Sequence, residues 1–148
     1  MKRVLCVAAV VSCVGVMSCL QKGNTGERRA VPPAVQEGVA ERFGDFADAV
    51  MSEDYGAIAK MVVKGQAEGF DARAFLEDRM RMKIGSFQVV VWNKKVLAIT
   101  PIQGRRRYLS QAVAHVRILA TNEVRPVYVN LYWESEGGNW CIVPFPGA

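Results

Sequence analysis

The 148-residue chain is poor in the side chains that most often carry chemistry. It has one histidine, His115, and four cysteines, three of which lie within the first 19 residues. A zinc site takes three or four ligands from residues of this kind, so the chain beyond residue 19 offers too few. The segment KGQAEG at residues 64–69 lacks the Lys-Ser/Thr pair that completes a phosphate-binding loop. We therefore expect no metal site, no cofactor and no enzymatic activity.

Charge is absent from a long stretch near the N-terminus. After Lys2 and Arg3 no charged residue occurs before Lys22, and the segment between them is almost wholly apolar. A short basic start followed by an apolar run is typical of a secretory signal. The sequence therefore predicts that the chain is exported.

The stretch VMSC at residues 16–19, where the apolar run ends, resembles a bacterial lipobox. The resemblance implies that the Cys19 sulfur receives a diacylglycerol group and that residues 1–18 are then removed as a lipoprotein signal peptide. Cys13 ends a similar pattern, but the apolar region before it is near the lower length limit for a signal. We predict lipid attachment at Cys19. Attachment at Cys13, an uncleaved anchor over residues 4–20 and plain secretion are the alternatives.

These features predict a location in the bacterial cell envelope, with the acylated N-terminus bound to membrane lipid. Residues 19–34 are rich in Gly, Pro and polar side chains without apolar periodicity, and we expect a flexible tether with a reach of roughly 20 Å. Without Lys2 and Arg3, 17 of the 19 basic residues remain against 14 acidic ones, a net charge of +3. Neither this charge nor the exported location favours a nucleic-acid partner.

Residues 35–148 are expected to form a single α+β domain that begins with helices. Apolar residues recur every three or four positions along the first helix, which is typical of an amphipathic helix; they are Val35, Val39, Phe43, Phe46, Ala47 and Val50. Ser52 or Asp54 is the expected N-cap of a second helix that stops near Lys64, and Asp71 is the expected N-cap of a third.

Beyond Gly85 the apolar period falls to two, which predicts strands. The candidate strands are residues 86–92, 95–100, 108–120, 127–135 and 139–145. Gly137 and Gly138 favour a tight hairpin between the last two strands, because glycine readily adopts positive φ. Helices followed by antiparallel strands predict an α+β fold in which N-terminal helices pack on a curved antiparallel sheet.

Two stretches are similar to the nuclear-transport-factor-two-like superfamily, which includes ketosteroid isomerase. FADAVMSEDYGAIAKMVV at residues 46–63 is similar to its opening helix pair, and VYVNLYWESEGGNWCIVPF at residues 127–145 to its closing hairpin. The resemblance implies a cone-shaped roll. Catalytic members carry acids, tyrosines or a His–Asp pair inside the cone, and none of these can be placed here. The expected inward residues are Val127, Val129, Leu131 and Trp133.

A second set of side chains alternates with the apolar ones and should lie on the opposite face of the sheet. We take this set as the candidate partner-binding residues: His115, Arg117, Tyr128, Asn130 and Tyr132. Tyrosine and arginine are enriched in protein interfaces, which favours a homodimer or an envelope protein as partner. An ordinary solvated sheet face is the equal alternative, because tyrosine and threonine are common on such faces. The sequence does not determine the register between the strands.

The leading functional hypothesis is a membrane-anchored envelope lipoprotein with a non-catalytic, protein-binding domain. The second is a carrier that holds a small apolar ligand in the cone, and the third is a hydratase- or isomerase-like enzyme. An inward acid or histidine beside a pocket would favour the enzyme, and a large apolar cavity the carrier. A filled cone would favour the binding domain.

Overall fold

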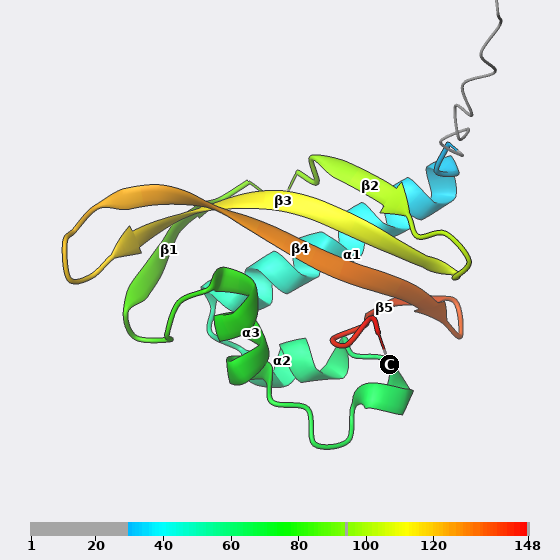
Figure 1. Cartoon of the computed structure of the whole chain (residues 1–148), viewed down its shortest axis with the longest axis horizontal. Helices are drawn as coiled ribbons and strands as arrows, with labels where there is room; N and C mark the ends of the chain where they lie inside the picture. Colours follow the sequence, from blue (N-terminus) through cyan, green and yellow to red (C-terminus); the bar gives the residue numbers. More distant parts are fainter. Residues whose placement is uncertain (1–29, 94, 148) are drawn as a thin grey trace, which may run out of the picture.

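The computed structural model describes residues 30–93 and 95–147. Within these residues, helices pack on one side of a strongly curled antiparallel sheet, which confirms the predicted α+β fold (Figure 1). The longest helix passes behind the sheet in Figure 1, and two shorter helices lie below it. The helices are α1 (Pro33–Met51), α2 (Tyr55–Lys60), the 3₁₀ helix η1 (Lys64–Gln66) and α3 (Ala72–Met80).

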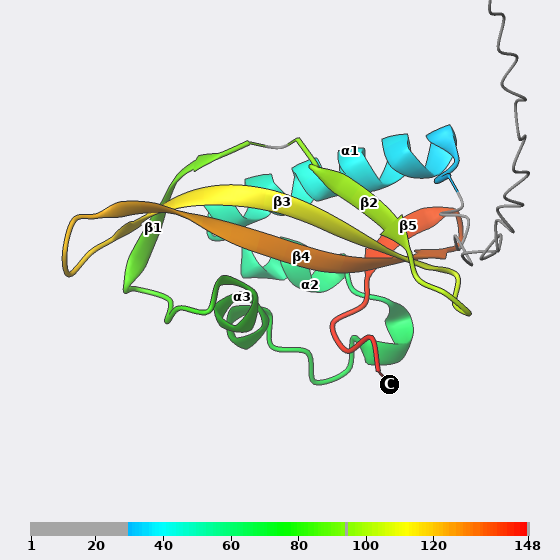
Figure 2. The ribbon, with the colours of Figure 1, turned by 45° about the horizontal axis from the view of Figure 1, so that its top comes forward.

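Two long strands form the middle of the sheet, and shorter strands pair with parts of them (Figure 2). The strand order is β1-β3-β4-β5, with β2 also paired to β3, on the same side of β3 as β1. β3 therefore has neighbours on both sides along most of its length. The strands are β1 (Phe87–Trp92), β2 (Ala98–Pro101), β3 (Arg107–Ile118), β4 (Val124–Glu136) and β5 (Asn139–Ile142).

The turn between β4 and β5 is the two-glycine hairpin that the sequence predicts. Gly137 and Gly138 have φ angles of 59° and 85°. Positive φ at both central residues is the requirement of the tight turn whose twist matches that of paired strands. β5 is shorter than the predicted strand 139–145, and the chain leaves the sheet before Pro144.

Acidic side chains cap the two shorter helices. Oδ1 of Asp54 accepts a hydrogen bond from the backbone N–H of Ala57 at 2.8 Å, so Asp54 rather than Ser52 begins α2. Asp71 accepts from the N–H groups of Arg73 and Ala74 at the start of α3. Such caps satisfy amide groups that have no partner within the helix.

The predicted end of the second helix near Lys64 is wrong, because α2 ends at Lys60. The following residues lie against β5: Ile142 N–H donates to the Met61 carbonyl at 2.7 Å. Val63 N–H donates to the Ile142 carbonyl at 3.0 Å, and Val62 forms a parallel bridge with Ile142. Hydrogen bonds to a strand that lies 80 residues away in sequence thus replace the last helical turn.

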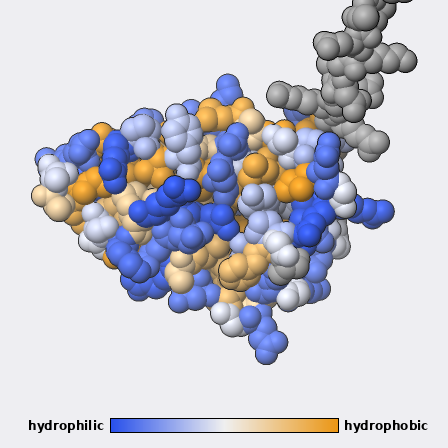
Figure 3. Space-filling view, viewed as in Figure 1, coloured by the Kyte–Doolittle hydropathy of each residue, from blue (hydrophilic) through white to orange (hydrophobic). Residues whose placement is uncertain are grey.

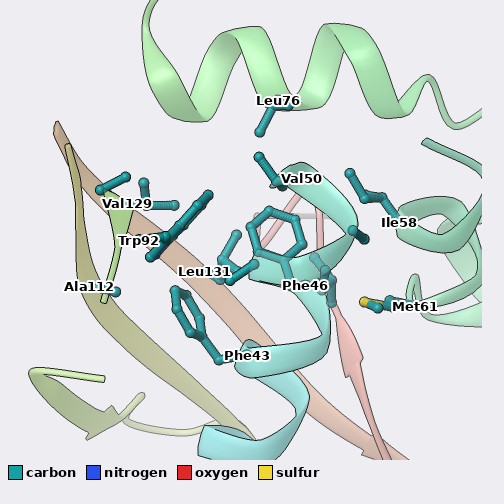
Figure 4. Close-up of a cluster of buried hydrophobic side chains, with 14 of the residues drawn as sticks. Phe43, Phe46, Val50, Ile58, Met61, Leu76, Trp92, Ala112, Val129 and Leu131 are labelled. Carbon is teal, nitrogen blue, oxygen red and sulfur yellow. The ribbon is translucent and has the colours of Figure 1, made fainter. Parts of the chain in front are cut away.

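Aromatic rings fill the concave side of the sheet (Figure 4). The Trp92 ring meets those of Phe43 and Phe46 edge-on, with both centroid distances at 5.8 Å. Edge-to-face pairs of this kind add to the stabilisation from burial. The predicted inward residues of β4 are confirmed, since Val129, Leu131 and Trp133 are fully buried and Val127 packs against the same core.

Trp133 carries the one polar atom that β4 places deep in this core. Its indole Nε1–H donates to Oγ of Ser110, which lies on β3, at 2.7 Å. Both residues have no exposed surface. A buried donor without a partner costs about 1–3 kcal/mol, so this pairing allows a tryptophan to occupy the interior.

We predict opposite effects for two glycine-to-alanine substitutions in α1. Gly44→Ala should stabilise the domain by about 1 kcal/mol, because alanine is the better helix former and nothing lies within 4 Å of the new methyl group. Gly38→Ala should be destabilising, because its methyl group would lie 2.7 Å from Cδ1 of Trp140. Overpacking of this kind costs about 1–3 kcal/mol and outweighs the gain in helix propensity.

The measurement is the free energy of unfolding in urea, for a chain that begins at Ala30. Gly44→Ala serves as the matched control, since both changes add one methyl group to the same helix. Equal stability of the two variants would contradict the packing of Trp140 on α1.

Candidate protein-binding surface

The strand register places the predicted binding residues on one face of the sheet. β3 and β4 pair so that Val113 lies opposite Tyr128, Gln111 opposite Asn130 and His115 opposite Pro126. The alternate residues of β3 point into the core; they are Ala112, Ala114 and Val116. We use the name outer face for the surface of the sheet that carries Val91, His115, Arg117, Tyr128 and Asn130.

The outer face is open in the described part of the chain, because α1 packs on the other side of β3 and β4 (Figure 1). The Tyr128 side chain is 70% exposed, and His115 and Asn130 are exposed as well. Apolar and polar areas alternate in the space-filling view (Figure 3). The face therefore offers apolar contact area between polar groups, which is the composition of many non-obligate interfaces.

Two exposed apolar residues of the outer face were not among the predicted ones. Val91 lies opposite His115 and Val124 opposite Arg117, and about half of each side chain is exposed. A register irregularity between Val89 and Val91 turns Val91 outward. The run of three valines at 89–91 shows no alternation, so the sequence carried no signal for this orientation.

Tyr132 is separated from the other predicted residues by its burial. Its side chain packs against a small apolar cluster of Val62, Val63 and Val143. The chain after β5 holds this cluster in place, and Val143 N–H donates to the Tyr132 carbonyl at 2.8 Å. Tyr132 therefore contributes mainly to packing at the far end of β4, and the open part of the face centres on Tyr128.

The interior of the curled sheet contains little that could transfer a proton. Among the described residues, Ser110 is the one polar residue that is buried, and its hydroxyl already accepts from Trp133. His115 points to the outer face. In the same part of the chain, no group of three His, Cys, Asp or Glu side chains is arranged to hold a metal ion.

Cys141 on β5 is a free, half-buried thiol. Burial raises the pKa of the Cys141 thiol, and the nearby Glu136 carboxylate adds to this effect. The thiolate is the nucleophilic form of cysteine, so a raised pKa makes the side chain less reactive. Cys141 instead packs against the apolar cluster of Val62, Val63 and Val143.

An ion pair holds the chain that leaves α3. Glu77 accepts from Lys83 Nζ at 2.7 Å and from the backbone N–H of Ile84 at 2.9 Å. The Lys83 hydrogen bond, followed by that of Ile84, lowers the pKa of the Glu77 carboxyl. The segment from Arg81 to Lys83 is thereby fastened to the last turns of α3.

Comparison with protein-family models, with curated proteins and with solved structures found no significant match to this chain. The resemblance to the nuclear-transport-factor-two-like superfamily stays a prediction. Cys13 and Cys19 lie outside the described residues, as does most of the predicted tether. In the range that the structure describes, no helix has the length and apolar character needed to cross a membrane.

We predict that Glu77→Gln lowers stability at pH 7 and that the effect fades in acid. The pKa of Glu77 is lower in the folded than in the unfolded chain, so its stabilisation is complete above the unfolded value of about 4.3. It is lost as the pH falls through the lower, folded value. Urea unfolding at pH 7, 5 and 3 measures this difference.

Glu68→Gln is the matched control, because Glu68 is exposed and makes no ion pair within the described residues. It should change stability little at any of the three pH values. A constant difference between Glu77→Gln and the parent from pH 7 to pH 3 would show that the carboxylate charge does not stabilise this segment.

Proposed function

We propose that this protein is a membrane-anchored lipoprotein of the bacterial cell envelope whose α+β domain binds another protein through the outer face. The observation that carries the proposal is the open sheet face around Tyr128, with exposed apolar and polar side chains side by side. The partner is either a second copy of the chain or another envelope protein. The lipid on Cys19 and the tether of residues 19–34 would hold the domain close to the membrane.

The packing of the interior supports a binding domain over a carrier. Ligand-binding cavities typically have volumes of about 300–1,000 Å³. Here Phe43, Phe46 and Trp92 occupy the middle of the concave side together with Leu131 (Figure 4). An apolar ligand would have to displace these rings.

The same packing disfavours the enzyme hypothesis. A general acid or base must lie within hydrogen-bond reach of a bound substrate. Apart from Ser110, the described core consists of apolar side chains and tryptophan. The resemblance to the nuclear-transport-factor-two-like superfamily is therefore proposed for the fold, without the catalytic activity of some of its members.

We predict that Cys19→Ser abolishes lipid attachment. Serine lacks the sulfur nucleophile, so the variant should not incorporate a fatty-acid probe and should be released from the membrane fraction. One or two acyl chains stabilise membrane binding by about 0.8 kcal/mol per buried methylene, which explains the expected release. Cys13→Ser is the control and should be labelled normally. Labelling that persists in Cys19→Ser and disappears in Cys13→Ser would move the site to Cys13.

The partner-binding prediction is tested by photocrosslinking in intact cells. The photoreactive residue benzoylphenylalanine replaces His115 on the outer face or Met51 at the end of α1 as a control. Both side chains are exposed, but only His115 lies on the outer face. We expect a discrete crosslinked product from position 115 alone, identified by mass spectrometry as a second copy or another envelope protein. No product, or the same products from both positions, would contradict the proposal.

A further inference from the structure

One half of β4 has a free edge. β5 pairs with β4 only from Trp133 to Glu136, and the residues from Val124 to Asn130 have β3 on one side alone. Among the described residues, no backbone hydrogen bond reaches that half from any element other than β3. A free edge presents unpaired N–H and C=O groups and can pair with another chain.

The hydrogen-bond pattern between β3 and β4 shows which backbone N–H and C=O groups of β4 point away from β3. Ile118 N–H donates to the Glu123 carbonyl, whereas the Tyr132 carbonyl accepts from the chain after β5. Because consecutive residues of a strand alternate in direction, the even-numbered residues of β4 face the free edge. Tyr128 and Asn130 each present an N–H and a C=O there. Pro126, which has no N–H, also occupies an edge position, where a proline is tolerated.

A groove runs along this edge. One wall is β4 from Arg125 to Asn130, and the other is the end of α3 with the residues after it, Asp78 to Met82. The groove has a volume of about 500 Å³. The wall that β4 forms is roughly 17 Å long, at about 3.4 Å per residue. An extended peptide has the shape that matches this length and the exposed backbone groups.

The groove is positively charged. Three arginines line it, Arg79, Arg81 and Arg125, against one carboxylate, that of Asp78. Arg79 is held in the structure, because its Nη2 donates to the Pro144 carbonyl at 2.8 Å. Arg81 and Arg125 are exposed and form no ion pair within the described residues, although Arg125 Nη2 donates a weak hydrogen bond to Met82 Sδ at 3.8 Å. Their charges are therefore available to a ligand.

Arg81 occupies a backbone position that suits glycine better. It follows the last residue of α3 in the left-handed conformation, with φ of 54° and ψ of 35°. Glycine is the usual residue there, since other residues meet a steric cost of about 1–2 kcal/mol. Arg81 therefore carries a backbone cost that glycine would avoid, and its side chain places a positive charge at the groove.

We propose that this groove binds an extended, acidic segment of a partner protein by β-strand addition to the free edge of β4. The N–H groups of Tyr128 and Asn130 donate to carbonyls of the segment, and their own carbonyls accept from its N–H groups. Arg81 and Arg125 pair with its Asp or Glu side chains. Main-chain bonds supply affinity in this mode of recognition, and flanking side chains supply specificity. The site goes beyond the proposed function, because it lies at the sheet edge and not on the outer face.

The first experiment selects ligands for the full chain in detergent from a displayed library of random 12-residue peptides. The Arg81→Glu, Arg125→Glu double variant serves for counter-selection. We expect enriched peptides that are rich in Asp and Glu and poor in proline. Failure to enrich any peptide, or enrichment of peptides without an acidic bias, would overturn the proposal.

The second experiment measures the dissociation constant of an enriched peptide, labelled with fluorescein, by polarisation. The double variant should bind at least about tenfold more weakly, because two attractive charges become repulsive. Arg106→Glu is the matched control, since Arg106 is exposed in the loop before β3 and away from the groove. It should bind within about twofold of the parent. An equal loss of peptide affinity in the double variant and in Arg106→Glu would indicate a general charge effect and contradict the proposed site.

Arg81→Gly separates binding from folding. Glycine relieves the backbone cost at this position, so the variant should unfold at a higher urea concentration than the parent while binding the peptide several-fold more weakly. Unchanged peptide affinity in Arg81→Gly would remove Arg81 from the proposed site.

Amide hydrogen exchange decides the mode of binding. The peptide should slow exchange at the amides of Tyr128 and Asn130 several-fold, and phosphatidylglycerol added to the detergent micelles should not compete with it. Binding without protection of these amides would overturn strand addition, and competition by this lipid would identify a headgroup site instead. The crosslinking experiment at position 115 tests the outer face, and the exchange experiment tests the edge of β4. Peptide binding with protected amides can occur even if no crosslink forms, so failure of the proposed function and failure of this inference are distinguishable.

Discussion

The antiparallel pairing of β3 with β4 is the constraint on which the other elements depend. It runs from the Arg107–Glu134 pair to the Arg117–Val124 pair. A ribbon of this length twists and coils, because each strand has a right-handed twist of its own. The curl gives the sheet a concave side deep enough for α1, with the rings of Phe43 and Phe46 in its centre. The side chains on the convex side are left to solvent or to a partner.

The free edge of β4 results from the unequal lengths of the strands. β5 leaves the sheet after Ile142, and the chain then turns toward α3, where Pro144 accepts a hydrogen bond from Arg79. The segment after α2 is hydrogen-bonded to the other edge of β5, where Val63 N–H donates to the Ile142 carbonyl. One end of β4 is thus covered by β5 and the C-terminal chain. Within residues 30–93 and 95–147, the other end has the tip of α3 beside it, with the groove between them.

The distribution of polar groups favours a functional site on the surface over one inside the fold. In the described core, Trp133 is paired with Ser110, the indole N–H of Trp92 has no hydrogen-bond partner, and the remaining contacts are apolar, so the interior mainly contributes stability. The exposed tyrosine, histidine and arginines lie on the outer face and along the free edge. The two surfaces adjoin at β4, where Tyr128 presents its side chain to one and its backbone to the other.

The sequence by itself determined the features that depend on neighbours along the chain. The cap at Asp71, the Gly137–Gly138 hairpin and the inward alternation of β4 were predictable, and the cap of α2 was narrowed to Ser52 or Asp54, because each follows from local backbone geometry or from period-two patterning. These features were sufficient for the fold class. They also placed Tyr128 and Asn130 on the face opposite the core.

Only the tertiary structure decided what depends on contacts between distant segments. The end of α2 at Lys60 results from hydrogen bonds to Ile142, and the burial of Tyr132 results from Val62, Val63 and Val143. The placement of His115 and Tyr128 on one surface depended on the register of β3 against β4, and the free edge depended on the length of β5. Each of these is set by the competition among distant segments for the same backbone groups and apolar surface, and no local pattern in a single sequence encodes that competition.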